Sequence, residues 1–462
     1  MRKLLILSFS LAYAFSCVAK VTTIYGVESS YAGKQLKLES KLDEIVGLTQ
    51  TLDSCLVDSI GRFCFKVDID RTQQVFIPME TENSFLFIEP GKNYEVRIPS
   101  YSERTLAQKL DPFFKPTDIL SEIVGLKSSD LNYKLMEFED AFDFYSMKHL
   151  VYGSRVDSIL GSINQMKEIF NDLYEDDYEA KFMEYRFLLL LNSTPQVYQD
   201  SIVVRLNNLG VEEENPAFWD IFNNLFENFI SQLVGKREEY VTFQRIIEEG
   251  NVKMYFAVLK NRYKITDKDL RELVAVKLLY DLLNQEQFDQ FKVIEMLQEI
   301  GSGIANPRNR DLLTYVLNSA SAMYIGSPVP DFTLIDVEGE KYKLSDFFGK
   351  FIYLNFENSM INQTQKDLEV LLRFQNDFKK DIEIINVGLY DTPERVSKLV
   401  HRYSGKMRFF YTENSDFIKK IYVIESVPSF FLIDKDGHFL MTKGAEPTDE
   451  LRMLLQKIFK SY

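Results

Sequence analysis

Residues 351–364 (FIYLNFENSMINQT) limit the fold of this chain most, because an uncharged apolar run passes directly into a helix-like pattern. The run FIYLNF is mostly aromatic and branched, which predicts a buried strand. It breaks at Glu357, Asn358 and Ser359, and a helix is expected to start near Asn362. Free N–H groups and the helix dipole stabilise an anion at such a junction. The stretch therefore predicts an α/β unit with a candidate site at the junction.

The sequence around this stretch contains further motifs in a recognisable order. They are residues 326–332 (GSPVPDF), 344–350 (LSDFFGK), 354–356 (LNF), 427–428 (VP) and 433–437 (IDKDG). Together they resemble the thioredoxin-like family of bacterial envelope thiol oxidoreductases and their peroxiredoxin relatives. The resemblance implies a C-terminal α/β thioredoxin-like domain over residues 324–462, with a cis bond before Pro428.

The chemistry of that family depends on the pattern W-x-x-x-C-x-x-C after the strand. Aligned on the LNF strand, Glu357 falls at the tryptophan position, Ile361 at the attacking cysteine and Thr364 at the resolving cysteine. Thiol–disulfide exchange needs a thiolate, and isoleucine has no group that ionises. A threonine hydroxyl is too weakly acidic unless a base activates it. The three cysteines of the chain end at Cys64, so the resemblance implies a kept fold, a degenerate CxxC and no catalytic residue.

In family members, a shallow groove beside the cis-proline holds an extended substrate segment. The positions that match this groove are Ser359, Met360, Ile361, Thr364, Val427 and Pro428. Without a cysteine the groove would be apolar and unreactive, and would bind an envelope protein or peptide by strand addition and side-chain pockets. In the alternative interpretation, Met360 and Ile361 cap the core and the domain is a structural platform.

The N-terminus, residues 1–19, is predicted to be a secretory signal peptide, with Arg2 and Lys3 before an apolar core. Cleavage after Ala19 would release a soluble protein. Alternatively, residues 14–17 (AFSC) resemble a lipoprotein box with Cys17 lipidated. The apolar run is too short to span a bilayer, and no later run approaches a span. We expect an exported protein of the periplasm or outer membrane of a Gram-negative bacterium.

Composition excludes several classes of function. A length of 462 residues with 45% hydrophobic content allows several packed domains. A net charge of −15 argues against nucleic acid, because no basic stripe is available to neutralise phosphates. The three histidines, His149, His401 and His438, are far apart, so we expect no metal site. No glycine-rich phosphate loop is present, and we expect no cofactor.

Residues 20–100 are predicted to form a small β-sandwich, because short alternating runs are separated by turns. The pattern of residues 57–63 and 85–91 resembles an uncharacterised β-domain that precedes thioredoxin-like modules. Cys55 and Cys64 flank a turn at 58–61. They would be directly opposite across a two-residue loop, and offset if Gly61 adds a bulge. A disulfide between them is one hypothesis, and two packed strand residues are the other.

Residues 101–322 are predicted to be helical, since apolar residues recur at three and four positions. Asn215 and Pro216 form a cap and a first-turn proline. The stripe after them could line a ligand groove or form a packed core; it comprises Phe218, Phe222, Phe226 and Phe229. The fold class is therefore multidomain α+β: a β-sandwich, a helical domain and a thioredoxin-like domain.

Three functional hypotheses follow. The first is a redox-inactive thioredoxin-like envelope protein that binds a partner or scaffolds an assembly. The second is a thiol–disulfide oxidoreductase or antioxidant-type enzyme that uses Cys55 and Cys64 or residues of another class. The third is an envelope protein whose ligand site lies in the helical domain. The sequence favours the first, because its thioredoxin-like part contains no cysteine.

Overall fold

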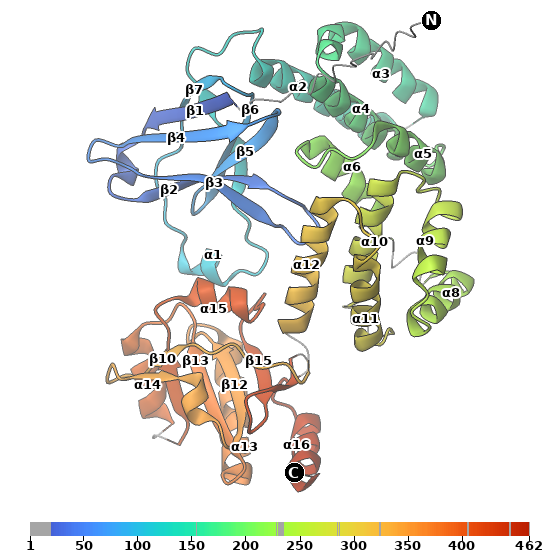
Figure 1. Cartoon of the computed structure of the whole chain (residues 1–462). Helices are drawn as coiled ribbons and strands as arrows, with labels where there is room; N and C mark the ends of the chain where they lie inside the picture. Colours follow the sequence, from blue (N-terminus) through green and yellow to red (C-terminus); the bar gives the residue numbers. More distant parts are fainter. Residues whose placement is uncertain are drawn as a thin grey trace, which may run out of the picture. The chain divides into compact units, whose positions relative to one another are not determined.

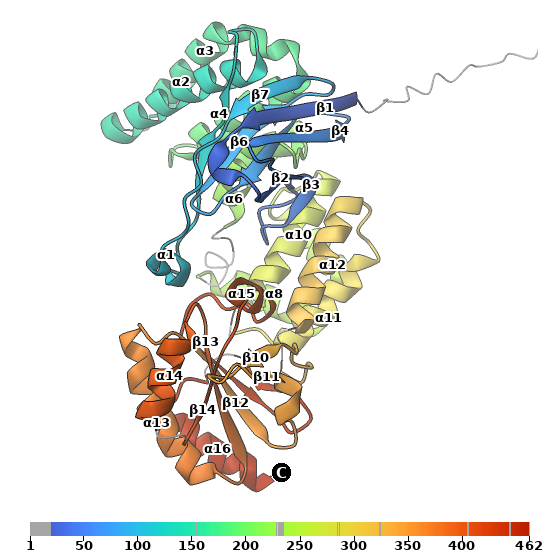
Figure 2. The same cartoon turned by 90° about the vertical axis from the view of Figure 1, so that its left-hand side faces the viewer.

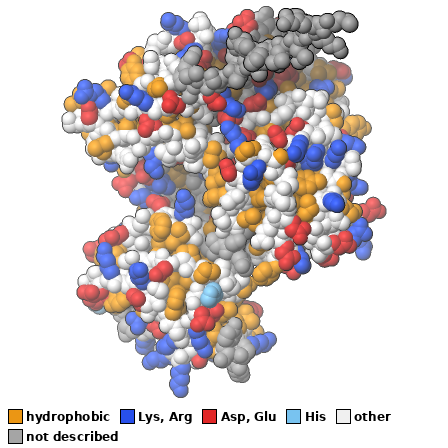
Figure 3. Space-filling view, in the orientation of Figure 1, with side chains coloured by type: hydrophobic (Ala, Val, Ile, Leu, Met, Phe, Trp, Pro, Cys, Tyr) orange, Lys and Arg blue, Asp and Glu red, His pale blue; other side chains and the backbone are white. Residues whose placement is uncertain are grey.

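The computed structural model describes residues 20–461 apart from positions 154, 228, 230–234, 284, 286, 323–324, 404–405 and 443–444. The predicted signal peptide and Cys17 lie outside the described residues. The chain divides into two compact units. Unit 1 comprises Met1–Ser102, Pro116–Val241 and Lys253–Lys277, and unit 2 comprises Glu103–Lys115, Thr242–Val252 and Leu278–Tyr462. Within the described part, no helix is long and apolar enough to cross a membrane. Acidic and basic side chains are intermingled over the face shown in Figure 3.

The N-terminal part of unit 1 is built from two β-sheets (Figure 1). The strands are β1 Lys20–Val27, β2 Gln35–Lys41, β3 Thr49–Leu56, β4 Arg62–Ile69, β5 Gln73–Pro78, β6 Glu82–Ile88, β7 Asn93–Arg97, β8 Thr117–Leu120 and β9 Glu122–Ile123. One sheet has the order β4-β1-β7-β9 and the other β3-β2-β5-β6-β8. Strand β1 runs antiparallel to β4 and parallel to β7.

Side-chain alternation explains how these sheets form one core. Every second residue of β4 is buried, from Phe63 to Ile69. Ile24 from one sheet and Leu38 from the other are both fully buried in the same cluster. Each strand thus places one face inward and the other in solvent, as a sandwich requires. The predicted β-rich N-terminal region is confirmed.

Strands continue beyond residue 100, into the segment predicted to be helical. Strand β8 pairs in parallel with β6, and β9 pairs antiparallel with β7. These strands have four and two residues, so they are too short to show an alternation. Only their pairing with distant strands makes them recognisable.

The middle of the chain is helical, as predicted. The helices are α1 Leu106–Leu110, α2 Leu131–Tyr152, α3 Val156–Ile169, α4 Asp177–Asn192, α5 Gln199–Leu209, α6 Pro216–Phe226, α8 Arg237–Glu248, α9 Val252–Asn261, α10 Lys268–Leu282, α11 Gln290–Gly301 and α12 Pro307–Ala322, with short 3-10 turns at Ser29–Tyr31 and Asn171–Glu175. The Asn215 side chain accepts a hydrogen bond from the backbone N–H of Ala217 and caps α6. The local signal at Asn215 and Pro216 therefore sets this helix start.

The C-terminal domain is a seven-stranded sheet with the order β11-β10-β14-β13-β12-β15-β16. Its elements are β10 Thr333–Ile335, β11 Lys341–Lys343, η3 Leu344–Phe347, β12 Phe351–Glu357, α13 Asn362–Phe378, β13 Ile382–Gly388, α14 Pro393–Arg402, β14 Arg408–Tyr411, α15 Ser415–Ile421, β15 Ser429–Ile433, β16 Phe439–Met441 and α16 Asp449–Ser461. Every residue of β12 is buried. The predicted strand and the helix start at Asn362 are confirmed.

Strand β12 separates two apolar layers (Figure 2). Phe351 and Tyr353 belong to a core that also holds buried residues of α13, α14 and α16. Ile352 and Leu354 belong to the opposite core, to which α15 contributes Ile418. Covering both faces of the sheet explains why β12 is apolar throughout.

Candidate functional site

The predicted site residues gather at one edge of the C-terminal sheet. The parallel strands β12 and β13 end together, with Glu357 paired to Gly388. Strand β15 runs antiparallel, and its first residue, Ser429, pairs with Phe356. The loops after β12 and β13 and the segment before β15 therefore meet at the same edge. In open α/β sheets this is the edge where ligands bind.

Helix α13 starts at this edge without a side-chain cap. Ile361 occupies the N-cap position and has no group to bond the first-turn N–H groups. The loop before it is held locally, because Met360 N–H donates to Asn358 Oδ1 at 3.0 Å. Met360 is 62% exposed. The junction thus exposes an apolar side chain together with the polar residues Asn362 and Gln363.

Asp391 ties the two loops of the edge together. Its carboxylate accepts hydrogen bonds from the backbone N–H and the hydroxyl of Ser359, both at 2.7 Å. Asn358 Nδ2 adds a bond to the carbonyl oxygen of Leu389, at 2.7 Å. A Cβ at Gly388 would lie 2.9 Å from Asp391 Cβ, so this clamp requires glycine there. Sequence reasoning missed Asp391, because its partner lies about thirty positions away in the chain.

The two positions predicted to match the family's cysteines differ in exposure. Ile361 is partly exposed, whereas Thr364 is fully buried. The Thr364 hydroxyl has no hydrogen-bond partner among the described residues. The nearby carboxylate of Asp367 instead accepts from Gln363 Nε2 at 2.7 Å. Because no base contacts this hydroxyl, the arrangement contains no activated threonine nucleophile.

Glu357 forms a buried acid beneath the helix start. Burial, followed by the charge of Asp391, raises the pKa of this carboxyl to about 8. Asn355 Nδ2 lies 3.4 Å from Glu357 Oε2 and 3.0 Å from Asn386 Oδ1. Because its pKa is raised above 7, Glu357 is mostly protonated at neutral pH. The sequence placed it at a strand break, and its burial was not expected.

The remaining groove residues keep the geometry that the resemblance implies. The Val427–Pro428 peptide bond is cis. Val427, Pro428 and Ser359 are partly exposed. Thr364 differs from the prediction: it faces the interior and does not line an open groove.

The two described cysteines are free thiols. Asp58 N–H donates to the carbonyl oxygen of Arg62, and Gly61 has φ +90°. The predicted hairpin register between the two cysteines is wrong, because Cys55 lies on β3 and Cys64 on β4, and these strands belong to different sheets. Cys55 packs against the sandwich core, whereas Cys64 is exposed. Burial raises the pKa of the Cys55 thiol, which lowers its reactivity. A disulfide between them stays a prediction.

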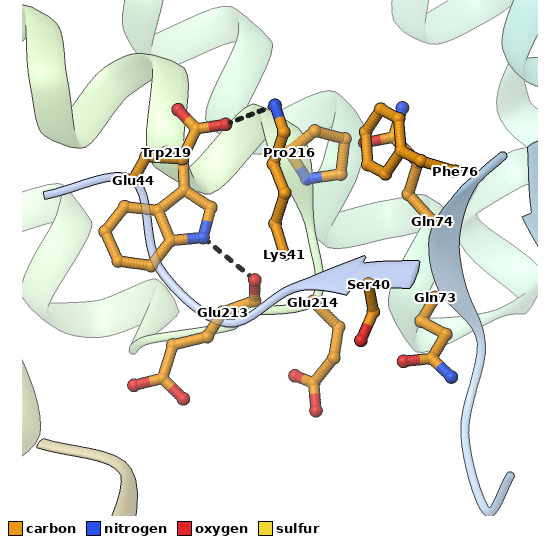
Figure 4. A pocket seen from close by; sticks show the side chains of 10 residues that line it. All are labelled: Ser40, Lys41, Glu44, Gln73, Gln74, Phe76, Glu213, Glu214, Pro216 and Trp219. Atoms are coloured by element: carbon orange, nitrogen blue, oxygen red, sulfur yellow. Dashed lines mark hydrogen bonds and ion pairs between the residues drawn. The ribbon is translucent and has the colours of Figure 1, made fainter. Parts of the chain in front are cut away.

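Two described features of unit 1 bear on the predicted ligand groove. The aromatic stripe of α6 is a packed core, because Phe218, Phe222 and Phe226 are all buried. A hollow between β2, β5 and α6 measures about 20 Å³, room for about one water molecule. Figure 4 shows Trp219 Nε1 donating to the carbonyl of Glu213, and Lys41 paired with Glu44. The first contact ties α6 to the loop before it, and the second ties the end of β2 to the loop after it.

The edge geometry, the cis-proline and the two covered faces of the sheet define a thioredoxin-like domain. The AhpC/TSA family model matches residues 325–439. Over 138 residues the chain is 33% identical to thiol-disulfide oxidoreductase ResA of Bacillus thuringiensis, covering 29% of this chain and 79% of that protein. The chain therefore belongs, through its C-terminal domain, to the thioredoxin-like thiol-disulfide oxidoreductase family.

Other relatives match the same domain or more of the chain. ResA of Bacillus subtilis is 27% identical over 127 residues, which are 27% of this chain and 70% of that protein. The thioredoxin domain of a thiol-disulfide oxidoreductase from Bacteroides vulgatus is 24% identical, covers 29% of this chain and 97% of its own, and has a TM-score of 0.28. A thioredoxin-like protein from Bacteroides caccae is 16% identical, covers 56% of this chain and 96% of its own, and has a TM-score of 0.34.

Proposed function

We propose that this is an exported cell-envelope protein whose thioredoxin-like domain is redox-inactive and binds an extended segment of an envelope protein. One observation carries the proposal: Ile361 and Thr364 stand where the family's thiols stand, and the chain has no cysteine after Cys64. A thiolate cannot be supplied at this edge. The export, to the periplasm or the outer membrane, rests on the signal-like N-terminus.

The edge keeps the features needed for binding. Met360 offers an exposed apolar anchor, and Val427 and Pro428 are partly exposed in the segment before β15, which starts at the same edge of the sheet. The Asp391 clamp holds the loop before α13 in place through Ser359. A preformed surface loses little conformational entropy on binding. An extended peptide with apolar side chains is the ligand that such a surface suits.

Peptide selection on the full chain tests this proposal. Peptides selected from a display library should lose binding about tenfold or more with Met360→Asp, because a charge would be buried in the contact. Met453→Asp is the matched control, since Met453 on α16 is 58% exposed compared with 62% for Met360. Equal binding by both variants would place the peptide site elsewhere and refute the proposal.

An oxidoreductase is the second candidate, and the free thiols of Cys55 and Cys64 favour it. Insulin disulfide reduction by the pure protein measures this activity. We expect no reduction above the buffer rate, because burial disfavours the Cys55 thiolate. A measurable rate that disappears in the Cys55→Ser, Cys64→Ser double variant would establish the enzyme and overturn the redox-inactive assignment.

A further inference from the structure

The ladder between strands β10 and β14 stops after one residue pair. Within the described part of the chain, Ile335 pairs with Tyr411 and no second pair follows. The next antiparallel partners would be Thr333 and Glu413. Both residues instead line a hollow of about 420 Å³, which is within the volume range of ligand pockets. The sheet therefore opens into a cavity between β10 and the chain that follows β14.

The backbone of β10 has an unpaired edge at this hollow. Successive residues of a strand direct their N–H and C=O groups to opposite edges. Phe332 directs its carbonyl oxygen to the β11 side, where Leu344 N–H donates to it at 3.2 Å. Thr333 therefore faces the opposite edge, where Ile335 alone has a strand partner among the described residues. An unpaired strand edge is a template for pairing with another extended backbone.

Local contacts on both sides hold the opening apart. The chain after β14 leaves the sheet because Asn414 caps α15, with its Oδ1 accepting from Phe417 N–H at 3.0 Å. Asn414 N–H also donates to Thr412 Oγ1 at 3.3 Å. On the other side, the Asp331 carboxylate accepts from the backbone N–H and the hydroxyl of Ser345, at 3.1 and 2.9 Å. The hollow is therefore a built feature of the domain.

The lining combines apolar surface with balanced charges. Ile335 and Ile418 are almost fully buried, and Phe417 of α15 is 49% exposed. The charged lining residues are two acids and one base: Asp331, Glu413 and Lys343. A second base, Lys341, lies with its Nζ 3.8 Å from Glu413 Oε2. Because the charges balance, recognition here depends on apolar contacts and on the open backbone edge.

We propose that the hollow binds an extended segment of another polypeptide, which adds a strand beside β10. The backbone of this segment would exchange hydrogen bonds with Thr333, and its alternate apolar side chains would contact Phe417 and the buried lining. A small apolar molecule fits less well, because it would leave the N–H and C=O groups of Thr333 unpaired. The inference is independent of the groove proposed at α13, since the described residues that line the hollow include none from that groove.

Peptide selection tests the hollow, with the chain from Lys20 onward carrying Met360→Asp as the bait. This bait lacks the apolar anchor of the proposed groove, so the two proposals can fail separately. Peptides selected from a display library are synthesised, and their Kd is measured by fluorescence anisotropy. Phe417→Ser, added to the bait, should weaken binding about tenfold or more, because an aromatic wall is lost. Met453→Ser is the matched control, since Met453 on α16 is 58% exposed; it should leave the Kd unchanged.

Two backbone readouts distinguish strand addition from other modes of binding. A peptide that is N-methylated at every residue has no backbone N–H donors and should bind about tenfold or more weakly. Hydrogen exchange measured by mass spectrometry should slow at Thr333 in the complex, because this amide gains a partner. The proposal would be overturned if no peptide is selected, if Phe417→Ser or N-methylation leaves the Kd unchanged, or if Thr333 gains no protection. Self-association of the bait that Phe417→Ser abolishes, without peptide binding, would also overturn it.

Discussion

Glu357→Gln should remove a pH dependence that the buried carboxyl gives to the stability of the C-terminal domain. Burial, followed by the charge of Asp391, raises the pKa of Glu357 from 4.5 to about 8 in the folded protein. The folded chain therefore holds this proton more tightly than the unfolded chain does. Its stabilising contribution is complete below pH 4.5 and is lost as the pH rises through about 8.

The size of the effect follows from the shift. One pKa unit corresponds to about 1.4 kcal/mol, so the loss across this window is on the order of 5 kcal/mol. Glutamine has the shape of the protonated acid and does not titrate. The free energies of unfolding of the two proteins should be similar near pH 4.5, and near pH 8 the variant should be more stable by most of this amount.

Hydrogen exchange of peptides from β12, measured by mass spectrometry, follows this domain selectively. Tryptophan fluorescence does not, because the single tryptophan, Trp219, is in unit 1. Intrinsic exchange rates change with pH, but they cancel when the protection of wild type and variant is compared at the same pH. Glu425→Gln, at an exposed position of the same domain, is the control. The protection factors of Glu357→Gln and wild type are compared as a ratio at each pH. The reasoning would be refuted if this ratio stays constant from pH 4.5 to 8.

Two backbone substitutions give further predictions. In a thermal unfolding assay, Gly388→Ala should lower the free energy of unfolding of the C-terminal domain by about 1–3 kcal/mol, because its Cβ would lie 2.9 Å from Asp391 Cβ. The control is Gly161→Ala on α3, where a Cβ would meet open space. This variant should raise the free energy of unfolding by about 1 kcal/mol in the same assay. Val423→Gly should raise the Tm by relieving φ +48° at an exposed position, worth about 1 kcal/mol. Val21→Gly, at an exposed strand position, should lower the Tm; equal shifts for the two valines would contradict the strain argument.

Local patterns predicted the elements that carry the site. The apolar run before Glu357 and the polar break after it were sufficient to place β12 and the start of α13. The resemblance placed the cis bond before Pro428, which the structure contains. These features depend on short stretches of sequence, so a single sequence contains the signal.

Features that depend on distant partners could not be predicted. Asp391 contacts Ser359 only because β12 and β13 end side by side. The burial of Glu357 depends on the same long-range packing, and its sequence neighbours are polar residues typical of an exposed turn. The hairpin predicted for Cys55 and Cys64 does not form, because β3 pairs with β2 and β4 pairs with β1 in the other sheet.

The arrangement of β12 between two cores has a consequence for how such a domain can evolve. Phe351 and Tyr353 anchor one layer, and Ile352 and Leu354 the other, while the family's thiol positions fall at and just after the helix start. Neither position lies on β12, although Thr364 is itself buried. A change of chemistry at these positions would therefore leave the residues that anchor both layers of the sheet in place.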